Sequence, residues 1–136
     1  MTDLFVGTWE LNPGKSEFDP NHRPAAATLI FELDAEGRYL MKAQGRKENG
    51  QTVTERPQQF TPDGQGHPLP EMPGLTVMTR WLDANSMQTE ARREDGSVVG
   101  GGTYVVSADG QSLTVTNFGW DSQLRQFQQK TVWDRL

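Results

Sequence analysis

The stretch LTVMTRWLDANSMQTEARREDGSVVGGGTYVVSADGQSLTVTNFGW, residues 75–120, decides the fold. Apolar and polar side chains alternate with a period of two, the pattern of half-buried β-strands, along four runs: residues 75–83, 86–94, 98–107 and 112–120. Turn-forming pairs separate the runs: Ala84-Asn85, Asp95-Gly96 and Asp109-Gly110. The sequence therefore predicts four consecutive antiparallel strands joined by tight hairpins.

The same pattern continues on both sides of this stretch. Alternating runs predict further strands at residues 5–11, 28–34, 38–45, 52–60 and 125–135. The run 52–60 is weaker, because it is polar and contains Pro57, which has no N–H for a strand ladder. Residues 12–27 and 61–74 are rich in proline and are predicted as loops, and no stretch of useful length has the period of a helix. About nine strands therefore follow one another as a meander.

A meander of this length has two exposed edges, and closing it into a barrel removes both. Only 34% of the residues are hydrophobic, below the usual share of roughly 45–50%, counted with glycine. A barrel of about 8 or more strands can hold polar side chains, a ligand or water inside. Four Trp, six Phe and two Tyr argue against a disordered chain. We predict an all-β protein, a single antiparallel up-and-down β-barrel of about 8–10 strands that spans residues 1–136 as one domain.

Charge and cysteine content restrict the function. The formal net charge of −5 disfavours a nucleic acid as partner, and no long apolar run predicts a membrane span. The absence of cysteine excludes disulfides, thiolate nucleophiles and Cys-ligated metals. The start at Met1-Thr2-Asp3 has no basic segment followed by a long apolar run, so no signal peptide is predicted and a cytoplasmic location is expected. The oligomeric state is not predicted.

The first strand carries a family resemblance. Phe5-Val6-Gly7-Thr8-Trp9-Glu10-Leu11 resembles the first strand of the calycins, the superfamily of lipocalins and fatty-acid-binding proteins, which opens with Gly-x-Trp after an aromatic residue. Three further segments are similar to small bacterial lipocalin-like proteins without an assigned activity: residues 12–18, Val98-Val99-Gly100 after an Asp-Gly turn, and the closing block 110–116. The resemblance implies a lipocalin-like barrel that binds a small hydrophobic or amphipathic molecule.

The resemblance also implies how one end of the barrel is closed. Calycins place an arginine near the end of the last strand over the first-strand tryptophan, and Arg135 stands at that position relative to Trp9. A guanidinium over an indole face contributes roughly 0.5–2 kcal/mol. Gly7 lets another chain segment approach the first strand closely. Gly7, Trp9 and Arg135 are therefore expected to close the barrel structurally.

Two features of fatty-acid-binding proteins are missing. Residues 12–27 contain too many prolines for the helix pair that covers their barrel, so no helical lid is expected. The Arg-x-Tyr pair that holds the fatty-acid carboxylate corresponds by position to Thr131-x-Trp133. The resemblance therefore does not extend to an anchor for a carboxylate.

Other motifs predict no catalytic residue, metal or cofactor. Gly14-Lys15-Ser16 imitates a phosphate-binding loop, but Trp9 stands where that motif needs glycine and no helix follows. The run 100–102, three glycines inside a predicted strand, indicates a bulge or a close backbone approach rather than dinucleotide binding. His22 and His67, both in proline-rich loops, are interpreted as solvated residues rather than metal ligands.

Aromatic and methionine side chains on the middle strands form the remaining candidate site. A cavity lined by aromatic residues and adaptable methionines is the usual small-molecule site, although the same residues could simply fill the barrel. The candidates for cavity lining are Tyr39, Met41, Met78, Trp81, Met87, Tyr104, Trp120 and Phe127.

Two other classes of function stay open from the sequence. A barrel-type isomerase or hydrolase would use charged groups inside the lumen, the candidates being Glu90, Arg92, Arg80 and His67. A filled barrel would instead act as an interaction protein through the loops 12–27 and 61–74.

Overall fold

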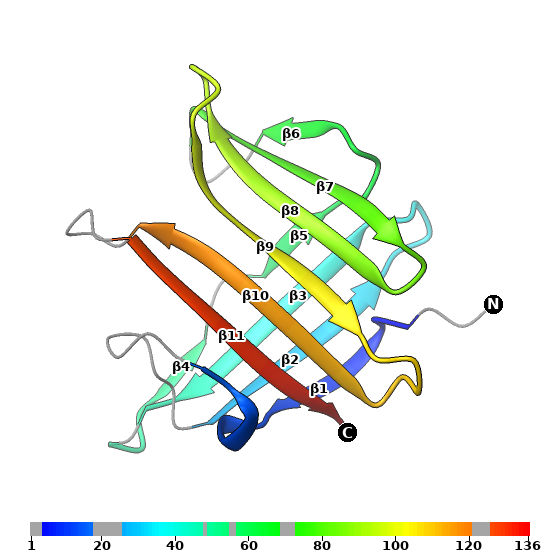
Figure 1. The fold of residues 1–136 in the computed structure, drawn as a ribbon, viewed down its shortest axis with the longest axis vertical. Coiled ribbons are helices and arrows are strands. Elements are labelled where there is room, and N and C mark those ends of the chain that lie inside the picture. The colour runs from blue at the N-terminus through cyan, green and yellow to red at the C-terminus, as the bar shows by residue number, and fades with distance from the viewer. Residues whose placement is uncertain (1–3, 18–25, 48, 55–56, 69–72, 121–125) are drawn as a thin grey trace.

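A computed structural model describes residues 4–17, 26–47, 49–54, 57–68, 73–120 and 126–136. Eleven strands form one sheet in the order β4-β3-β2-β1-β11-β10-β9-β8-β7-β6, and β5 also pairs with β3 (Figure 1). The strands are β1 (Gly7–Leu11), β2 (Ala26–Leu33), β3 (Tyr39–Arg46), β4 (Thr52–Thr54), β5 (Gln58–Phe60), β6 (Gly66–Pro68), β7 (Leu75–Asp83), β8 (Ser86–Arg93), β9 (Val98–Val106), β10 (Ser112–Trp120) and β11 (Gln126–Arg135).

Every pair of neighbouring strands is antiparallel, and the first strand pairs with the last. Trp9 of β1 lies opposite Arg135 of β11, and Leu11 lies opposite Trp133. The chain therefore goes up and down around a barrel in sequence order, which confirms the predicted all-β, up-and-down architecture. The hairpins of residues 75–120 lie where the alternation predicts them.

The two remaining ends of the sheet, at β3 and β7, are each extended by short strands: β4 and β5 pair with β3, and β6 pairs with β7. Phe60 of β5 pairs with Tyr39 of β3. The Gly64 N–H then donates to the Thr79 carbonyl of β7 at 2.8 Å, and Gly66 of β6 pairs with Met78. The chain between β5 and β6 thus crosses from the end of the sheet at β3 to the end at β7.

This crossing changes two expectations. The predicted strand 52–60 is two strands, β4 and β5, because Pro57 between them cannot donate to a ladder. The predicted loop 61–74 contains β6, whose three residues complete the edge of β7.

The segment after β1 contains one turn of 3-10 helix, η1 (Pro13–Lys15). The Asn12 side chain caps it by accepting the Lys15 N–H at 3.3 Å. The described residues contain no α-helix, and none of their helices is long and apolar enough to cross a membrane. Residues 18–25, on which the expectation of no helical lid also depends, lie outside the described part of the chain.

The three glycines of β9 keep the register with β10 and pack against backbone. A Cβ at Gly101 would lie 2.7 Å from the Thr89 carbonyl oxygen, and one at Gly102 would lie 2.9 Å from the Thr116 carbonyl oxygen. The ladder between β8 and β9 shifts register between Ala91 and Arg92. The glycines therefore serve a close backbone approach beside a bulge, as the sequence predicts.

Candidate functional site

The strand register defines which side chains face the barrel interior. Directly opposed residues of an antiparallel pair share a face, and alternate residues along a strand change face. Phe31 and Trp9 are 1% and 0% exposed, which fixes the inner face of β1 and β2. Thr79 and Met87, 1% and 0% exposed, fix it for β7 and β8.

One row of inward residues is apolar and crosses the sheet from β7 to β10. It consists of cross-strand partners: Trp81, Met87, Tyr104 and Val115. Aromatic rings from β2, β3 and β5 meet this row inside the barrel. Phe60 stacks on both Tyr39 and Tyr104, with ring centroids 5.6 and 6.3 Å apart. This end of the interior is a packed aromatic cluster.

The cluster continues to the end of the barrel where β1 begins. Phe5 is fully buried and its ring lies 5.7 Å from that of Trp81. The Trp9 indole N–H donates to the Phe5 carbonyl at 3.0 Å, and the Arg135 guanidinium carbon lies 4.1 Å from the Trp9 ring centroid. Gly7 has φ of +140°, and a Cβ there would lie 2.6 Å from Arg135 Nη1. We propose that Gly7, Trp9 and Arg135 together close this end of the barrel, which we call the closed end.

The next inward row, one step toward the opposite end, is polar. Its members are cross-strand partners from β7 to β11: Thr79, Thr89, Gly102, Asn117 and Gln129. We refer to these five residues as the polar belt. The Thr79 hydroxyl and the Gln129 side-chain oxygen are buried and have no hydrogen-bond partner within the described part of the chain. Buried polar groups are nearly always paired, so these two oxygens point to a site.

The row beyond the polar belt is small and apolar. It consists of Val77, Ala91, Gly100, Gly119 and Phe127. A Cβ at Gly119 would lie 3.3 Å from the Phe127 ring, so this ring packs on the glycine backbone. Small residues leave space inside the barrel that larger ones would fill.

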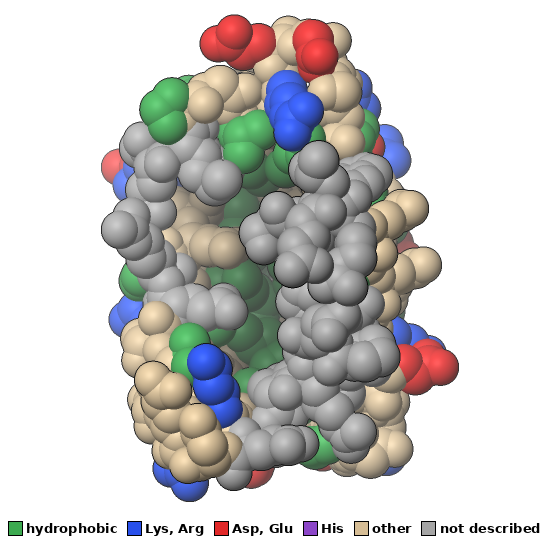
Figure 2. All heavy atoms as spheres, turned by 90° about the vertical axis from the view of Figure 1, so that its left-hand side faces the viewer, with side chains coloured by type: hydrophobic (Ala, Val, Ile, Leu, Met, Phe, Trp, Pro, Cys, Tyr) green, Lys and Arg blue, Asp and Glu red, His purple; other side chains and the backbone are tan. Residues whose placement is uncertain are grey.

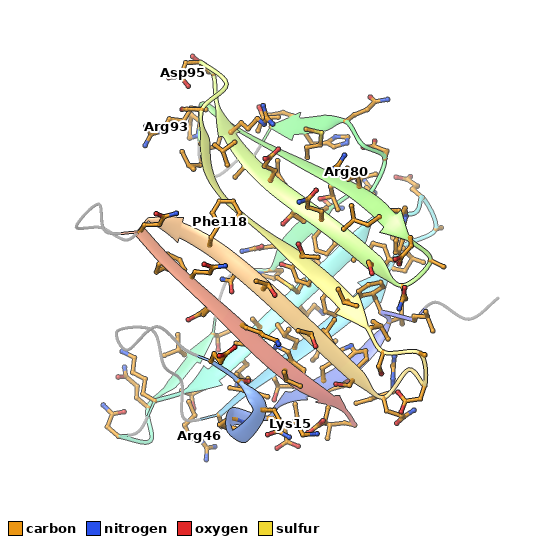
Figure 3. The ribbon with its side chains drawn as sticks, viewed as in Figure 1. Lys15, Arg46, Arg80, Arg93, Asp95 and Phe118 are labelled. Carbon is orange, nitrogen blue, oxygen red and sulfur yellow. The ribbon has the colours of Figure 1, made fainter. Side chains whose placement is uncertain are left out.

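This row lies at the end of the barrel where β10 ends and β11 begins. Seen from that side, the molecule is hollowed, and the side chains on the floor of the hollow are hydrophobic (Figure 2). Arg93, at the end of β8, and Arg46, at the end of β3, lie at the upper and lower parts of the same side (Figure 3). We call this end the mouth.

The structure does not bring the eight predicted lining residues together in one place. Tyr39, Met41 and Met87 are buried in the aromatic cluster, which Tyr104 and the partly exposed Trp81 join from their inward positions. Phe127 lies apart from them in the row near the mouth. The side chain of Trp120 lies outside the described part of the structure.

Met78 does not share their face. It lies opposite Glu90 and alternates with the inward residues Val77 and Thr79, so it is on the outer face of β7. The run 75–83 has apolar residues at both odd and even positions, so the sequence alone does not show which of the two sets faces the barrel interior.

Three of the four residues considered for catalysis, Glu90, Arg92 and Arg80, are on the outer face of the barrel. Glu90 and Arg92 form an ion pair of 2.8 Å whose side chains are 35% and 44% exposed. Arg80 donates to Gln88 on the outer face, and His67 pairs with Asp63 at 2.9 Å with both side chains well exposed. Glu90, Arg92 and Arg80 therefore do not point into the lumen, whereas His67 lies opposite the inward residue Val77, at the exposed edge of the inner face.

The aspartates whose pKa is lowered also lie on the outside of the barrel, in turns between strands. The Gln65 backbone N–H lowers the pKa of Asp63, and His67 adds to this effect. The Arg38 backbone N–H similarly lowers the pKa of Asp34. These shifts come from turn hydrogen bonds, and no three or more His, Cys, Asp or Glu of the described residues are grouped so that they could hold a metal ion.

The sequence interpretation missed the polar belt. Thr79, Thr89 and Asn117 do not stand out in the sequence, because polar residues in a strand normally indicate the solvent face. The sequence does contain a signal, the spacing of these residues along the strand: Thr79 stands two residues before Trp81, and Thr89 stands two residues after Met87. Each therefore shares a face with an aromatic or methionine candidate.

Solved structures with the same architecture cover the whole chain. The wild-type fluorescent protein UnaG matches with a TM-score of 0.65 and 13% identity over 100% of both chains. Secretory abundant heat soluble protein 4 from Ramazzottius varieornatus matches with a TM-score of 0.61 and 15% identity, over 100% of this chain and 97% of that one. A Schistosoma mansoni fatty acid binding protein in complex with arachidonic acid matches with a TM-score of 0.59 and 11% identity, over 98% and 96%.

These similarities define the class by fold. The chain has the fold of these proteins, a fatty-acid binding protein among them, and this is the fold that the resemblance of the first strand implies. No protein-family model matches the sequence, and no curated protein matches it. The closer resemblance to small bacterial lipocalin-like proteins stays a prediction.

Proposed function

We propose that this protein binds a small hydrophobic or amphipathic molecule inside the barrel, through the mouth. The observation that carries the proposal is the change in lining along the barrel axis. The closed end is packed with aromatic rings, whereas the polar belt and the small residues Ala91, Gly100 and Gly119 lie toward an apolar hollow. The similarity to a fatty acid binding protein solved with arachidonic acid supports the same function.

The test uses 1,6-diphenylhexatriene, a hydrocarbon whose fluorescence rises in an apolar site. We expect saturable binding to the wild-type protein. Ala91→Phe places a large ring on the inner face of β8 and should abolish this binding. Arg92→Phe adds the same ring on the outer face, next to Glu90, and is the matched control.

The two variants separate a lumen site from a surface site. Loss of binding in Ala91→Phe with retention in Arg92→Phe supports the proposal, provided that both variants keep the far-ultraviolet circular dichroism of a β-protein. Equal binding in the wild-type protein and Ala91→Phe would place the probe on the surface and contradict it.

A further inference from the structure

We propose that the bound molecule is uncharged at the polar belt and hydrogen-bonds there through a hydroxyl or amide group. This inference rests on the proposed function and specifies the class of ligand. It concerns an alcohol-like or amide-like molecule with an apolar body, as distinct from a carboxylate.

The first argument is the unpaired polar atoms. Thr79 is 1% exposed, yet its hydroxyl oxygen has no partner among the described residues, and neither has the buried oxygen of Gln129. The adjacent inward residue of β11 behaves differently. The Thr131 hydroxyl donates to the Val115 carbonyl at 3.4 Å and accepts the Trp133 indole N–H at 2.9 Å.

The chemistry of these atoms sets the partner. A threonine hydroxyl both donates and accepts, and a glutamine amide presents either its oxygen or its NH₂ group after a half-turn. A ligand hydroxyl or amide has the same dual character and can satisfy both residues. A group that only accepts, such as a carboxylate, can use only their donors.

The second argument is charge. Among the described inward positions, the ionisable residues are Arg93, which is exposed at the mouth, Arg135 at the closed end, and His67 of β6, which lies opposite Val77, is exposed and pairs with Asp63 at 2.9 Å. Arg135 is occupied, because its guanidinium donates to the carbonyl groups of Leu4, Val6 and Gly110. A carboxylate at the polar belt would lose its hydration without gaining a cation, which is strongly unfavourable.

The third argument is the position of the polar belt between two apolar zones. Toward the closed end it borders the row with Met87 and Tyr104, which is packed. Toward the mouth it borders the row with Gly119 and Phe127. The ligand therefore enters with its polar group first, and its apolar body occupies the space near the mouth.

The experiment displaces diphenylhexatriene with 1-dodecanol and with dodecanoate, in the wild-type protein and in Thr79→Val. This change keeps the side-chain shape and removes the hydroxyl. Because a single hydrogen bond is at stake, we expect dodecanol to bind about 5- to 10-fold more weakly to Thr79→Val, with diphenylhexatriene unchanged. Thr114→Val on the outer face of β10, opposite Val105, is the control and should leave dodecanol binding unchanged.

The outcomes are distinguishable. Loss of dodecanol affinity in Thr79→Val alone supports the inference. If diphenylhexatriene binds but dodecanol does not distinguish Thr79→Val from Thr114→Val, the proposed function stands and the inference is wrong. Tighter binding of dodecanoate than of dodecanol to the wild-type protein would also overturn it. If diphenylhexatriene itself does not bind, the proposed function fails.

Discussion

Replacing Trp9 by alanine should remove most of the stability of the barrel. Trp9 is 0% exposed, its indole N–H donates to the Phe5 carbonyl at 3.0 Å, and the Arg135 guanidinium covers its ring at 4.1 Å. Truncating a fully buried tryptophan costs about 3–5 kcal/mol. The lost cation–π contact, worth roughly 0.5–2 kcal/mol, places Trp9 at the upper end of that range. Domains have only about 5–15 kcal/mol of stability in total.

The assay is equilibrium unfolding in urea, followed by far-ultraviolet circular dichroism so that loss of a tryptophan does not alter the signal. Trp81→Ala is the matched control: Trp81 is 41% exposed, and we expect its truncation to cost about half as much or less. If Trp9→Ala does not fold at all, Trp9→Phe reports the same site, because it keeps the ring volume in part and loses the bond to Phe5.

A double-mutant cycle with Arg135→Ala isolates the contact between the two side chains. Arg135→Ala alone should cost less than Trp9→Ala, because the arginine is partly exposed. The coupling energy from the cycle, with Trp9→Phe as partner if needed, should be about 1 kcal/mol. A Trp9→Ala loss within about 1 kcal/mol of the wild type, smaller than nearly all losses at core tryptophans, would refute the assignment of Trp9 to the closure.

Three further changes should act in different directions. Thr79→Val should stabilise the ligand-free protein by about 1 kcal/mol, because it removes a buried hydroxyl that has no partner among the described residues. The expected result is a higher urea midpoint; an unchanged or lower midpoint would mean that the Thr79 hydroxyl is paired. Gly101→Ala should destabilise the protein by about 1–3 kcal/mol in the same assay, because the new Cβ would lie 2.7 Å from the Thr89 carbonyl oxygen. Gly45→Ala is the control: its Cβ would lie at an ordinary distance of 3.5 Å from the Ala26 carbonyl oxygen, so it should cost less. The backbone N–H of Arg38 lowers the pKa of Asp34 in the folded protein, so the unfolded chain takes up a proton at this residue at a higher pH than the folded one. The free energy of unfolding should therefore decrease as the pH falls below about 4. The urea midpoint of Asp34→Asn should fall less than that of the wild type between pH 5 and pH 3.

The sequence predicts the strands well because alternation and turn chemistry act locally. The Asp95-Gly96 and Asp109-Gly110 turns fix two hairpins by themselves, and each strand needs only its own period to be recognised. The joining of β3 to β7 is different. It depends on Phe60 pairing with Tyr39 and on the Gly64 N–H reaching the Thr79 carbonyl, contacts between segments that no local pattern relates.

The inner face is harder to predict than the strands, because one residue of phase inverts it. Met78 shows this: only its cross-strand partner, Glu90, reveals that it lies outside. The polar belt shows the complementary error, since Thr79 and Gln129 are inward although they are polar. Hydrophobicity alone assigns such residues to solvent, and the strand register of the whole barrel is needed to place them.

The proposed site would separate stability from binding along the axis of this barrel. The rings of Phe5, Phe31 and Tyr39 and the Trp9–Arg135 contact concentrate apolar burial at the closed end, where changes should act mainly on unfolding. Toward the mouth, glycines and oxygens without a partner among the described residues contribute little to packing, and we expect Thr79 to lower the stability of the ligand-free protein. A buried polar group that destabilises the ligand-free fold is best explained by a ligand that hydrogen-bonds to it when bound. Opposite effects of Thr79→Val on stability and on dodecanol binding would demonstrate that division in a single residue.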